Sequence, residues 1–348
     1  MVVTGILLKF PYWLGWQLRR LMRGPGKVAF YLDSEHDHAV IEHILPHLNF
    51  PFDLVARNLK VASALRKRGI AVKTWPVFPP AVIMARHALH RFPIKAVRKA
   101  GLKHGPHFFK KMIRAEKFNA FDLFIFISEN EVGTAKKNGV RVGVAGGYPR
   151  LDAFSHPKTI ALSEKILKQP GFDSSKKTLL FTATWDQSGM SAVDRWIDEL
   201  QGLKERFNLL VSLHPMMSEE QLRKAKAVPG IFLASPEDLP ACMLAADFLI
   251  GDTSSVLAEF CALDKPIITF RVDTGRRLSS EIRQMISEIS LQIDKLEELD
   301  QAILRYQENP QLKQSERQRW NKIFFDNPSG SHGKKVAAIL NQWVQTAV

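Results

Sequence analysis

Polar side chains follow several apolar runs of this chain at points where a buried strand would end. The clearest case is ADFLIGDTSSVLAEF (246–260), in which the apolar run stops before Asp252, Thr253, Ser254 and Ser255. Hydroxyls beside the free amides at a helix start can bind an anion such as a phosphate, and the same side chains also serve as helix caps. The sequence therefore predicts a helix cap here that is also able to hold a phosphate.

Two histidines stand in similar places. His104 precedes Gly105, which lets a backbone approach a ligand closely, and Lys110 and Lys111 are near; His214 ends an apolar run before a proline. An imidazole of near-neutral pKa can accept the proton of an attacking hydroxyl. A lone histidine is more often structural than catalytic, and His104 is the better placed of the two, so the interpretation as a catalytic pair depends on the residues around them.

Further candidates are Arg150 and Asp152 in GYPRLD and Thr184 in FTATW, each after an expected strand. Open α/β sheets bind ligands at the carboxyl ends of their strands, so we expect these residues to line a cleft between two domains. The chain contains no GxGxxG after its first strand, no P-loop sequence and no HExxH or CxxC pair. Its carboxylates fall in separate motifs, so the sequence requires no metal and leaves magnesium open.

Strand-like runs alternate with helical patterns, which is typical of α/β proteins with parallel sheets. We expect Rossmann-like domains over residues 25–155 and 177–326, a linker over 156–176 and a C-terminal helix over 327–348. Strands are expected at 27–33, 71–75, 121–128 and 141–146 in the first half, and at 177–185, 207–215, 230–235, 246–252 and 265–270 in the second.

Length, cysteine content and charge limit the class of protein, its compartment and its binding partners. With 348 residues and 45% apolar content, the chain is long enough for two cores. Cys242 and Cys261 lie in apolar surroundings, which predicts core positions and a reducing cytosol. The first 150 residues hold 25 Lys and Arg against 9 Asp and Glu, whereas the rest hold 24 against 26. The basic half is expected to face a polyanion or an anionic membrane, and no recognised nucleic-acid motif accompanies it.

The apolar stretch within residues 1–24 is too short and too interrupted for a membrane span, and the charge follows this stretch instead of preceding it, unlike in a secretory signal. Trp13 and Trp16 beside Arg19 and Arg20, without any acid, predict an amphipathic segment at an anionic membrane surface. The alternative is a helix packed on the domain. Basic residues between 86 and 117, interleaved with phenylalanines, extend this surface toward phosphate lipids or an anionic acceptor, or form a solvated helix face.

The ordered set HG, GYPRLD, FTATW, LHP and DTSSVLAEF followed by DKPIITFRVD, over roughly residues 100–275, resembles the CDP-glycerol glycerophosphotransferases, which include teichoic-acid primases and polymerases. The resemblance implies a GT-B fold, with two Rossmann-like domains facing across a cleft. It also implies transfer of glycerol phosphate or a related alditol phosphate from a CDP-linked donor to a hydroxyl of a lipid-linked or polymeric acceptor. Such an enzyme would be cytoplasmic and peripheral at the inner face of the cell membrane.

The same resemblance makes His104 and His214 the functional pair, and it places Ser254 and Ser255 with the donor phosphates. Asp273, downstream of KPI, belongs to the matching set. Thr253 and Asp186 stand where the family usually has tyrosine and arginine. The assignment of glycerol phosphate as the transferred group therefore comes from the family resemblance and not from these residues. A GT-B UDP-sugar glycosyltransferase or 2-epimerase remains an alternative, as does a non-catalytic protein that binds anionic membranes.

Overall fold

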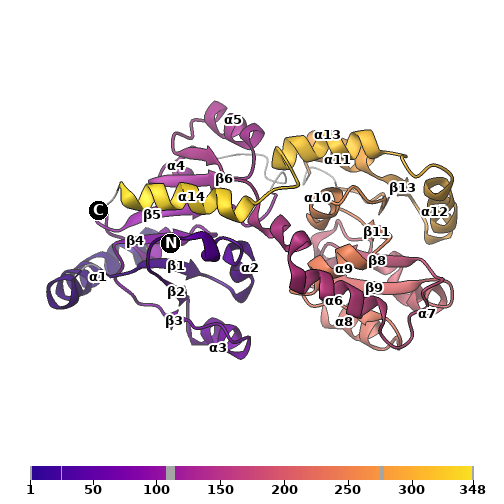
Figure 1. Cartoon of the computed structure of the whole chain (residues 1–348), viewed down its shortest axis with the longest axis horizontal. Helices are drawn as coiled ribbons and strands as arrows, with labels where there is room; N and C mark the ends of the chain where they lie inside the picture. Colours follow the sequence, from indigo (N-terminus) through magenta and orange to yellow (C-terminus); the bar gives the residue numbers. More distant parts are fainter. Residues whose placement is uncertain (1, 25, 107–113, 275–277, 347–348) are drawn as a thin grey trace. The chain divides into compact units, whose positions relative to one another are not determined.

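Contacts between elements divide the chain into two units, each built around one parallel sheet (Figure 1). The computed structural model describes residues 2–24, 26–106, 114–274 and 278–346. The first unit combines residues up to Gly105, a segment that ends at Asp152 and the C-terminal stretch from Gly330, whereas the second runs from Ala153 to Ser329. The chain therefore crosses to the second unit and returns to the first for its last helix.

The sheet of the first unit has the strand order β3-β2-β1-β4-β5-β6-β7, with parallel pairing. Its strands are β1 (Val28–Leu32), β2 (Phe52–Ala56), β3 (Lys73–Thr74), β4 (Ala81–Met84), β5 (Arg98–Leu102), β6 (Leu123–Phe126) and β7 (Gly143–Ala145). Its helices are α1 (Val2–Arg23), α2 (His38–Ile41), α3 (Leu59–Lys67), α4 (Ala115–Phe118), α5 (Glu129–Lys137) and α14 (His332–Gln345). The strand order reverses direction between β1 and β4, which makes this pair the topological switch point of the unit.

Strand β1 shows why this sheet needs helices on both faces. All five of its residues are buried, and successive side chains point to opposite faces. Phe30 packs in a cluster with residues of α2, α3 and α14, whereas Tyr31 packs in a second cluster with residues of α1 and α5. Parallel strands that are buried on both faces read as unbroken apolar runs, as VAFYL does.

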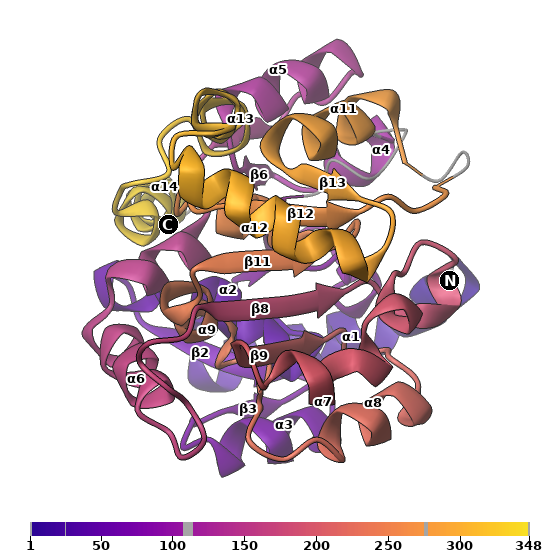
Figure 2. The same cartoon turned by 90° about the vertical axis from the view of Figure 1, so that its right-hand side faces the viewer.

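The sheet of the second unit has the order β10-β9-β8-β11-β12-β13 and is also parallel (Figure 2). Its strands are β8 (Thr178–Ala183), β9 (Asn208–Leu213), β10 (Phe232–Leu233), β11 (Phe248–Gly251), β12 (Ile267–Phe270) and β13 (Leu291–Ile293). Its helices are α6 (Pro157–Leu167), α7 (Leu200–Leu203), α8 (Glu219–Lys226), α9 (Leu239–Ala245), α10 (Val256–Cys261), α11 (Ser280–Ile289), α12 (Leu299–Glu308) and α13 (Gln314–Phe325). Its switch point lies between β8 and β11.

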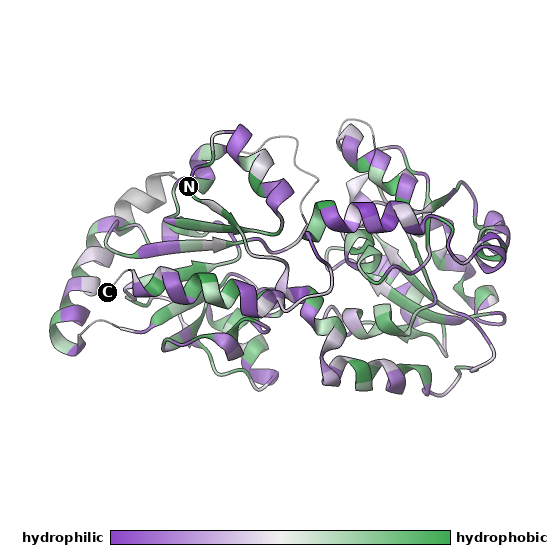
Figure 3. Ribbon diagram, turned by 45° about the horizontal axis from the view of Figure 1, so that its top comes forward, coloured by the Kyte–Doolittle hydropathy of each residue, from purple (hydrophilic) through white to green (hydrophobic). Residues whose placement is uncertain are grey.

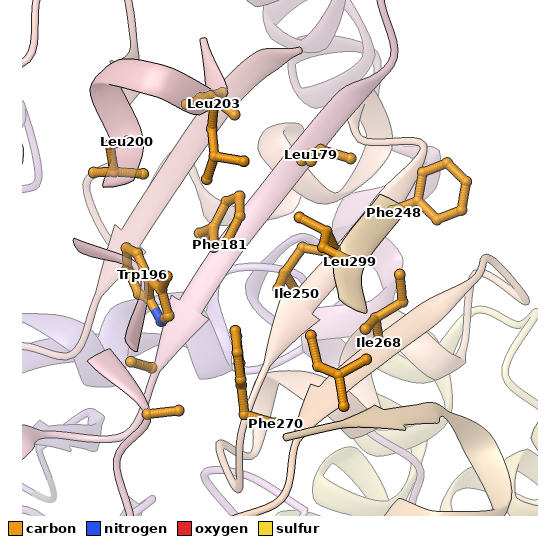
Figure 4. Close-up of a cluster of buried hydrophobic side chains, with 14 of the residues drawn as sticks. Leu179, Phe181, Trp196, Leu200, Leu203, Phe248, Ile250, Ile268, Phe270 and Leu299 are labelled. Carbon is orange, nitrogen blue, oxygen red and sulfur yellow. The ribbon is translucent and has the colours of Figure 1, made fainter. Parts of the chain in front are cut away.

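One core cluster of this second unit joins strand side chains to the helices that cover one face of the sheet. Figure 4 shows Phe181 of β8 beside Trp196, and the two ring centroids are 5.1 Å apart. Ile250 of β11 and Leu299 of α12 belong to the same cluster. Apolar residues accordingly concentrate in the strands, whereas the helices carry hydrophobic and hydrophilic residues together (Figure 3). This packing fixes the strand ends from which the candidate site residues emerge.

The segment expected to be a linker opens with a helix that belongs to the second unit. Helix α6 packs against α9, and the turn 169–176 then leads into β8. In the first half, the sequence pattern did not indicate strands β2, β4 and β5. Helix α2, which follows β1, is short, because Pro46 comes within a few residues of its end and the chain continues as single 3₁₀ turns.

Candidate active site

Four groups of predicted residues in the second unit follow neighbouring strands. Thr184 follows β8, His214 follows β9, the segment from Asp252 to Ser255 follows β11, and Asp273 follows β12. Since β9, β8, β11 and β12 are consecutive in a parallel sheet, their carboxyl ends share one edge. Residues up to 89 positions apart in the sequence (Thr184 and Asp273) are thus brought to the edge where open α/β sheets bind ligands.

Asp252 is the centre of a buried hydrogen-bond network at the switch point. Its side chain accepts hydrogen bonds from the Thr184 amide (3.0 Å), the Thr184 hydroxyl (2.9 Å), the Ala192 amide (3.0 Å) and its neighbour's amide. Burial raises the pKa of Asp252, and these donors oppose the rise. Because the protein occupies its carboxylate oxygens, the prediction that Asp252 binds substrate is corrected: this side chain holds the loops after β8 and β11 together.

Thr184 and Thr253 belong to the same network, and the substrate contacts predicted for them stay predictions. Their hydroxyls lie 3.0 Å apart, and the Thr253 hydroxyl also lies 3.3 Å from the Met190 carbonyl oxygen. Thr253 is buried. With both hydroxyls engaged inside the fold, these threonines position the loop that carries the two serines after them.

The serines of DTSS remain partly exposed at the start of α10. The Ser254 hydroxyl accepts a hydrogen bond from the Val256 amide at 3.3 Å, which confirms the predicted helix cap. Ser255 is the residue before the helix, and its side chain makes no capping bond. The contact with substrate predicted for both serines stays a prediction, as it does for Asp273, which is exposed on the same edge of the sheet.

The ring of His214 is oriented by the chain that follows it. The Met216 amide donates a hydrogen bond to His214 Nδ1 at 3.1 Å, so in the neutral ring the proton resides on Nε2. Burial lowers the pKa of His214, against the opposing charge of Asp252, and so favours this neutral form. His214 therefore presents an N–H donor at Nε2, which suits a group that stabilises negative charge.

His104, in the first unit, has the opposite tautomer, with the proton on Nδ1. Its Nδ1 lies 3.0 Å from the carbonyl oxygen of Ala85, which can only accept, so Nδ1 carries the proton. Burial and then the charge of Arg86 lower the pKa of His104. The neutral ring consequently keeps its lone pair on Nε2, as a general base requires. Gly105 follows directly and is buried, and its predicted substrate contact stays a prediction.

The GYPRLD motif anchors the last helix to the first unit. The carboxylate of Asp152 accepts hydrogen bonds from the His332 and Gly333 amides, at 2.9 and 2.7 Å, where α14 begins. Gly147 has φ +93°, and a Cβ atom there would lie 2.2 Å from the His332 ring. Asp152 therefore has a structural role at the start of α14, and the substrate contacts predicted for Asp152 and Arg150, which are both partly exposed, stay predictions.

The first helix lies against the sheet with one face and leaves the other exposed. Trp16 is buried and donates a hydrogen bond from Nε1 to the Pro79 carbonyl at 3.1 Å, so the prediction that it contacts a membrane is wrong. Trp13 is 42% exposed, Arg20 is exposed over the Trp16 ring, and Arg19 is partly exposed. Lys110 and Lys111 lie outside the described residues.

Sequence reasoning missed Asp37 and Arg86, which stand beside His104 at the switch point of the first unit. Arg86 Nε lies 2.7 Å from Asp37 Oδ1, and Arg86 directly follows the residue whose carbonyl orients His104. The apolar run AVIMA (81–85) carried the signal, because a strand there would have placed Arg86 at its carboxyl end. The proline-rich stretch WPVFPP (75–80) directly before it concealed that strand.

Comparison with known proteins identifies the family. Residues 134–341, more than half of the chain, match the model of the family described as CDP-Glycerol:Poly(glycerophosphate) glycerophosphotransferase. The chain belongs to the CDP-glycerol glycerophosphotransferase family. Glycerophosphotransferase membership was predicted from the ordered motifs and is confirmed.

Two curated relatives and one solved structure add detail. The chain is 30% identical over 142 residues to the teichoic acid poly(glycerol phosphate) polymerase of Bacillus spizizenii (strain W23), covering 37% of this chain and 35% of the polymerase. It is 26% identical over 220 residues to the poly(ribitol-phosphate) polymerase of the same strain, covering 60% and 33%. The wall teichoic acid polymerase TagF superposes with a TM-score of 0.69 at 12% identity, covering 98% of each chain.

This chain thus spans about a third of the length of those two curated relatives. The likeness to TagF confirms the predicted α/β, GT-B-like fold. Within the described part of the chain, no helix has the length and apolarity to cross a membrane. The described residues also contain no group of three or more His, Cys, Asp or Glu side chains arranged to hold a metal ion.

Proposed function

We propose that this chain transfers glycerol phosphate, or a related alditol phosphate, from a CDP-linked donor to a hydroxyl of a lipid-linked or polymeric acceptor in wall-polymer synthesis. Family membership gives the reaction class. The observation that carries the proposal is the opposite orientation of two neutral imidazoles: His104 is held through its Nδ1–H, and His214 is held through an unprotonated Nδ1. One ring can accept a proton at Nε2, and the other can donate a hydrogen bond from Nε2.

In the proposed step, the acceptor oxygen forms a bond to the donor phosphorus that bears glycerol. The anhydride bond between that phosphorus and the CMP oxygen breaks, and its electron pair leaves with CMP. His104 Nε2 takes the proton of the attacking hydroxyl, while His214 Nε2–H donates to a phosphate oxygen as negative charge develops on the leaving group. General-base catalysis contributes about 10²–10⁴-fold, and one well-placed donor contributes about 10²–10³-fold.

The donor phosphates are assigned to the edge of the second sheet that carries Ser254 and Ser255. Both side chains are partly exposed, whereas the buried Asp252 network fixes the loop from which they project. Hydroxyl groups held in place in this way bind phosphate oxygens without first being ordered. Substituting Ser254 and Ser255 with alanine together should weaken binding of CDP-glycerol in calorimetry, and affinity equal to that of the unmodified chain would contradict the assignment.

A single set of assays tests the reaction class. Purified chain incubated with an acceptor and with CDP-glycerol, CDP-ribitol or a UDP-sugar should release CMP from a CDP-alditol. Release of UDP, or epimerisation of the sugar, would instead support the UDP-sugar alternative. His104→Ala and His214→Ala should each slow the release at least about a hundredfold while leaving the thermal midpoint within a few degrees of the unmodified value. Biological activity that survives both substitutions would support the non-catalytic alternative.

We further propose that the step requires no resident metal, because side chains fill the proton-accepting and charge-stabilising roles. Dialysis against EDTA should leave the rate of CMP release unchanged. Loss of activity that Mg²⁺ restores would overturn this proposal.

The exposed face of α1 supports a peripheral position at the inner face of the cell membrane. Its exposed apolar residues recur at helical spacing, from Phe10 (69% exposed) through Leu18 (48%) to Leu21 (83%). Arg20 and Arg23 are exposed beside them, and the helix contains no acid. An apolar stripe flanked by basic residues suits the headgroup region of an anionic bilayer, where each basic residue contributes about 1 kcal/mol.

Binding to vesicles tests this position with a matched control. Leu18→Glu should reduce co-sedimentation with phosphatidylglycerol-rich vesicles, whereas Leu304→Glu, at a leucine 51% exposed on α12, should not. Vesicles of phosphatidylcholine alone should bind the chain weakly. Equal binding of the two variants to the anionic vesicles would contradict the proposal.

A further inference from the structure

Arg86 places a cation next to the proposed catalytic base. It follows β4 and is the next residue after Ala85, whose carbonyl oxygen lies 3.0 Å from His104 Nδ1. Strands β4 and β5 pair up to Met84 opposite Gly101, so the chain segments carrying Arg86 and His104 leave the sheet side by side. Any molecule that presents a hydroxyl to His104 therefore passes close to this guanidinium.

The guanidinium of Arg86 is anchored from one side. Its Nε lies 2.7 Å from Oδ1 of Asp37, which is almost fully buried. Asp37 is in turn held by the amides of Asp33 and Ser34, at 2.8 and 3.1 Å. The Arg86 side chain is nevertheless 42% exposed, and among the described residues its two terminal nitrogens have no protein partner. An arginine fixed in this way can bind a phosphate through two parallel N–H bonds with little further loss of freedom.

A second arginine repeats the arrangement two strands away. Arg57 follows β2, and its Nη1 lies 3.5 Å from Oδ2 of Asp33, which follows β1. Its side chain is 46% exposed. Strands β2 and β4 flank β1, so the ends from which Arg57 and Arg86 emerge are about 9–10 Å apart. Two half-exposed arginines, each held by an aspartate of the β1 loop, therefore lie in a row that ends at His104.

We propose that Arg86 binds the last phosphodiester of the acceptor and that Arg57 binds the preceding one. This inference rests on the proposed function. An acceptor that already ends in glycerol phosphate presents its terminal hydroxyl one three-carbon unit from its last phosphate, so binding that phosphate at Arg86 brings the hydroxyl to His104. The consequence is selectivity: the chain extends acceptors that already carry phosphate and discriminates against a bare hydroxyl.

Kinetics with acceptors of defined length test this row of arginines. The probes are synthetic lipids that carry a glycerol without phosphate, one phosphoglycerol unit or three phosphoglycerol units, each with CDP-glycerol as donor. Arg86→Gln should raise KM for the one-unit acceptor about 10- to 100-fold, as loss of a charge-assisted hydrogen bond predicts, and leave KM for CDP-glycerol unchanged. Arg57→Gln should raise KM for the three-unit acceptor only. The unmodified chain should use the phosphate-free lipid least well.

Arg206→Gln provides the matched control, because Arg206 is 51% exposed, pairs with an aspartate and belongs to the second unit. Its kinetic constants should equal those of the unmodified chain. If Arg86→Gln fails to fold because Asp37 loses its partner, Arg57→Gln and the charge-retaining Arg86→Lys carry the test, with Arg86→Lys expected to show an intermediate KM. A rise in KM for CDP-glycerol would assign Arg86 to the donor instead, and unchanged KM values for all acceptors would overturn the proposal.

Direct binding separates this inference from the proposed function. A trimer of glycerol phosphate titrated into the unmodified chain, Arg86→Gln and Arg206→Gln gives affinities without turnover. If no donor releases CMP, the proposed reaction fails, yet selective loss of trimer binding in Arg86→Gln would still support the arginine row. Equal affinity in all three proteins, or none in any, would overturn it.

Discussion

The role of His214 can be tested by replacing each ring nitrogen separately. In His214→Asn, the side-chain oxygen can still accept the hydrogen bond that the Met216 amide gives to Nδ1, but nothing replaces the N–H at Nε2. In His214→Gln, the longer side chain places an amide nitrogen near the former Nε2. The contact with the Met216 amide is solvent-exposed, so water replaces it at little cost. The two variants thus differ chiefly in the donor that the proposed mechanism needs.

The size of the expected effect follows from the role of a single donor. Loss of one donor to the charge that develops on the leaving phosphate costs about 10²–10³ in kcat, or about 2.7–4 kcal/mol. We expect His214→Asn to show this loss, and His214→Gln to recover at least a tenfold part of it. The measurement is CMP release at saturating CDP-glycerol and acceptor, with thermal midpoints recorded for both variants.

Two results would refute this reasoning. A His214→Gln variant as slow as His214→Asn, with both variants folded, would show that the ring acts otherwise than as an Nε2–H donor. A His214→Asn variant with an undiminished kcat would remove the residue from the reaction.

Three further predictions concern the base, the loop network and the last helix. His104→Gln should lose about 10²–10⁴ in kcat, because an amide cannot accept the proton. Burial lowers the pKa values of both histidines, so both rings are neutral at pH 7. The kcat/KM of the unmodified chain should therefore be constant above the ordinary histidine pKa of 6.5 and fall only below it. A fall in rate that begins above that value would contradict this. In Asp252→Asn, the new side-chain NH2 group faces backbone amides, such as that of Ala192, that then lack an acceptor. Each such buried amide should lower the free energy of unfolding in urea by about 1–3 kcal/mol. A total change below about 0.5 kcal/mol would contradict the network. Asp152→Ala should speed amide hydrogen exchange at the start of α14, whereas unchanged protection there would contradict the anchoring contact.

The sequence predicted the second unit more completely than the first, for a physical reason. Strands such as β8 and β11 are buried on both faces and read as unbroken apolar runs that end in polar residues. Strand β5, in contrast, begins with Arg98 and Lys99, which are only partly buried, and contains Gly101, so its pairing with β4 and β6 decides its structure. Tertiary pairing of this kind is not visible in a local pattern.

The same limit explains why the sequence could not distinguish structural motif residues from residues that can act on a substrate. Thr184, Asp252 and Asp152 satisfy the pattern of strand-end polar residues as well as His214 does, yet their polar atoms are bound within the fold. Which carboxylate meets which amide depends on strand order, because Thr184 and Asp252 are 68 residues apart and become neighbours only at the β8–β11 switch point.

The distinction between structural residues and exposed, charged residues also indicates where specificity for the acceptor can change during evolution. Substituting Asp252 or Asp152 disturbs loops or a helix and therefore costs stability before it alters a substrate contact. Arg57 and Arg86 differ from these aspartates, because each pairs with an aspartate on one side and is exposed on the other. A substitution there changes the charged surface that an anion can contact and has less effect on the sheet. Selectivity among acceptors can thus vary at the ends of β2 and β4, while the base after β5 and its carbonyl anchor stay in place.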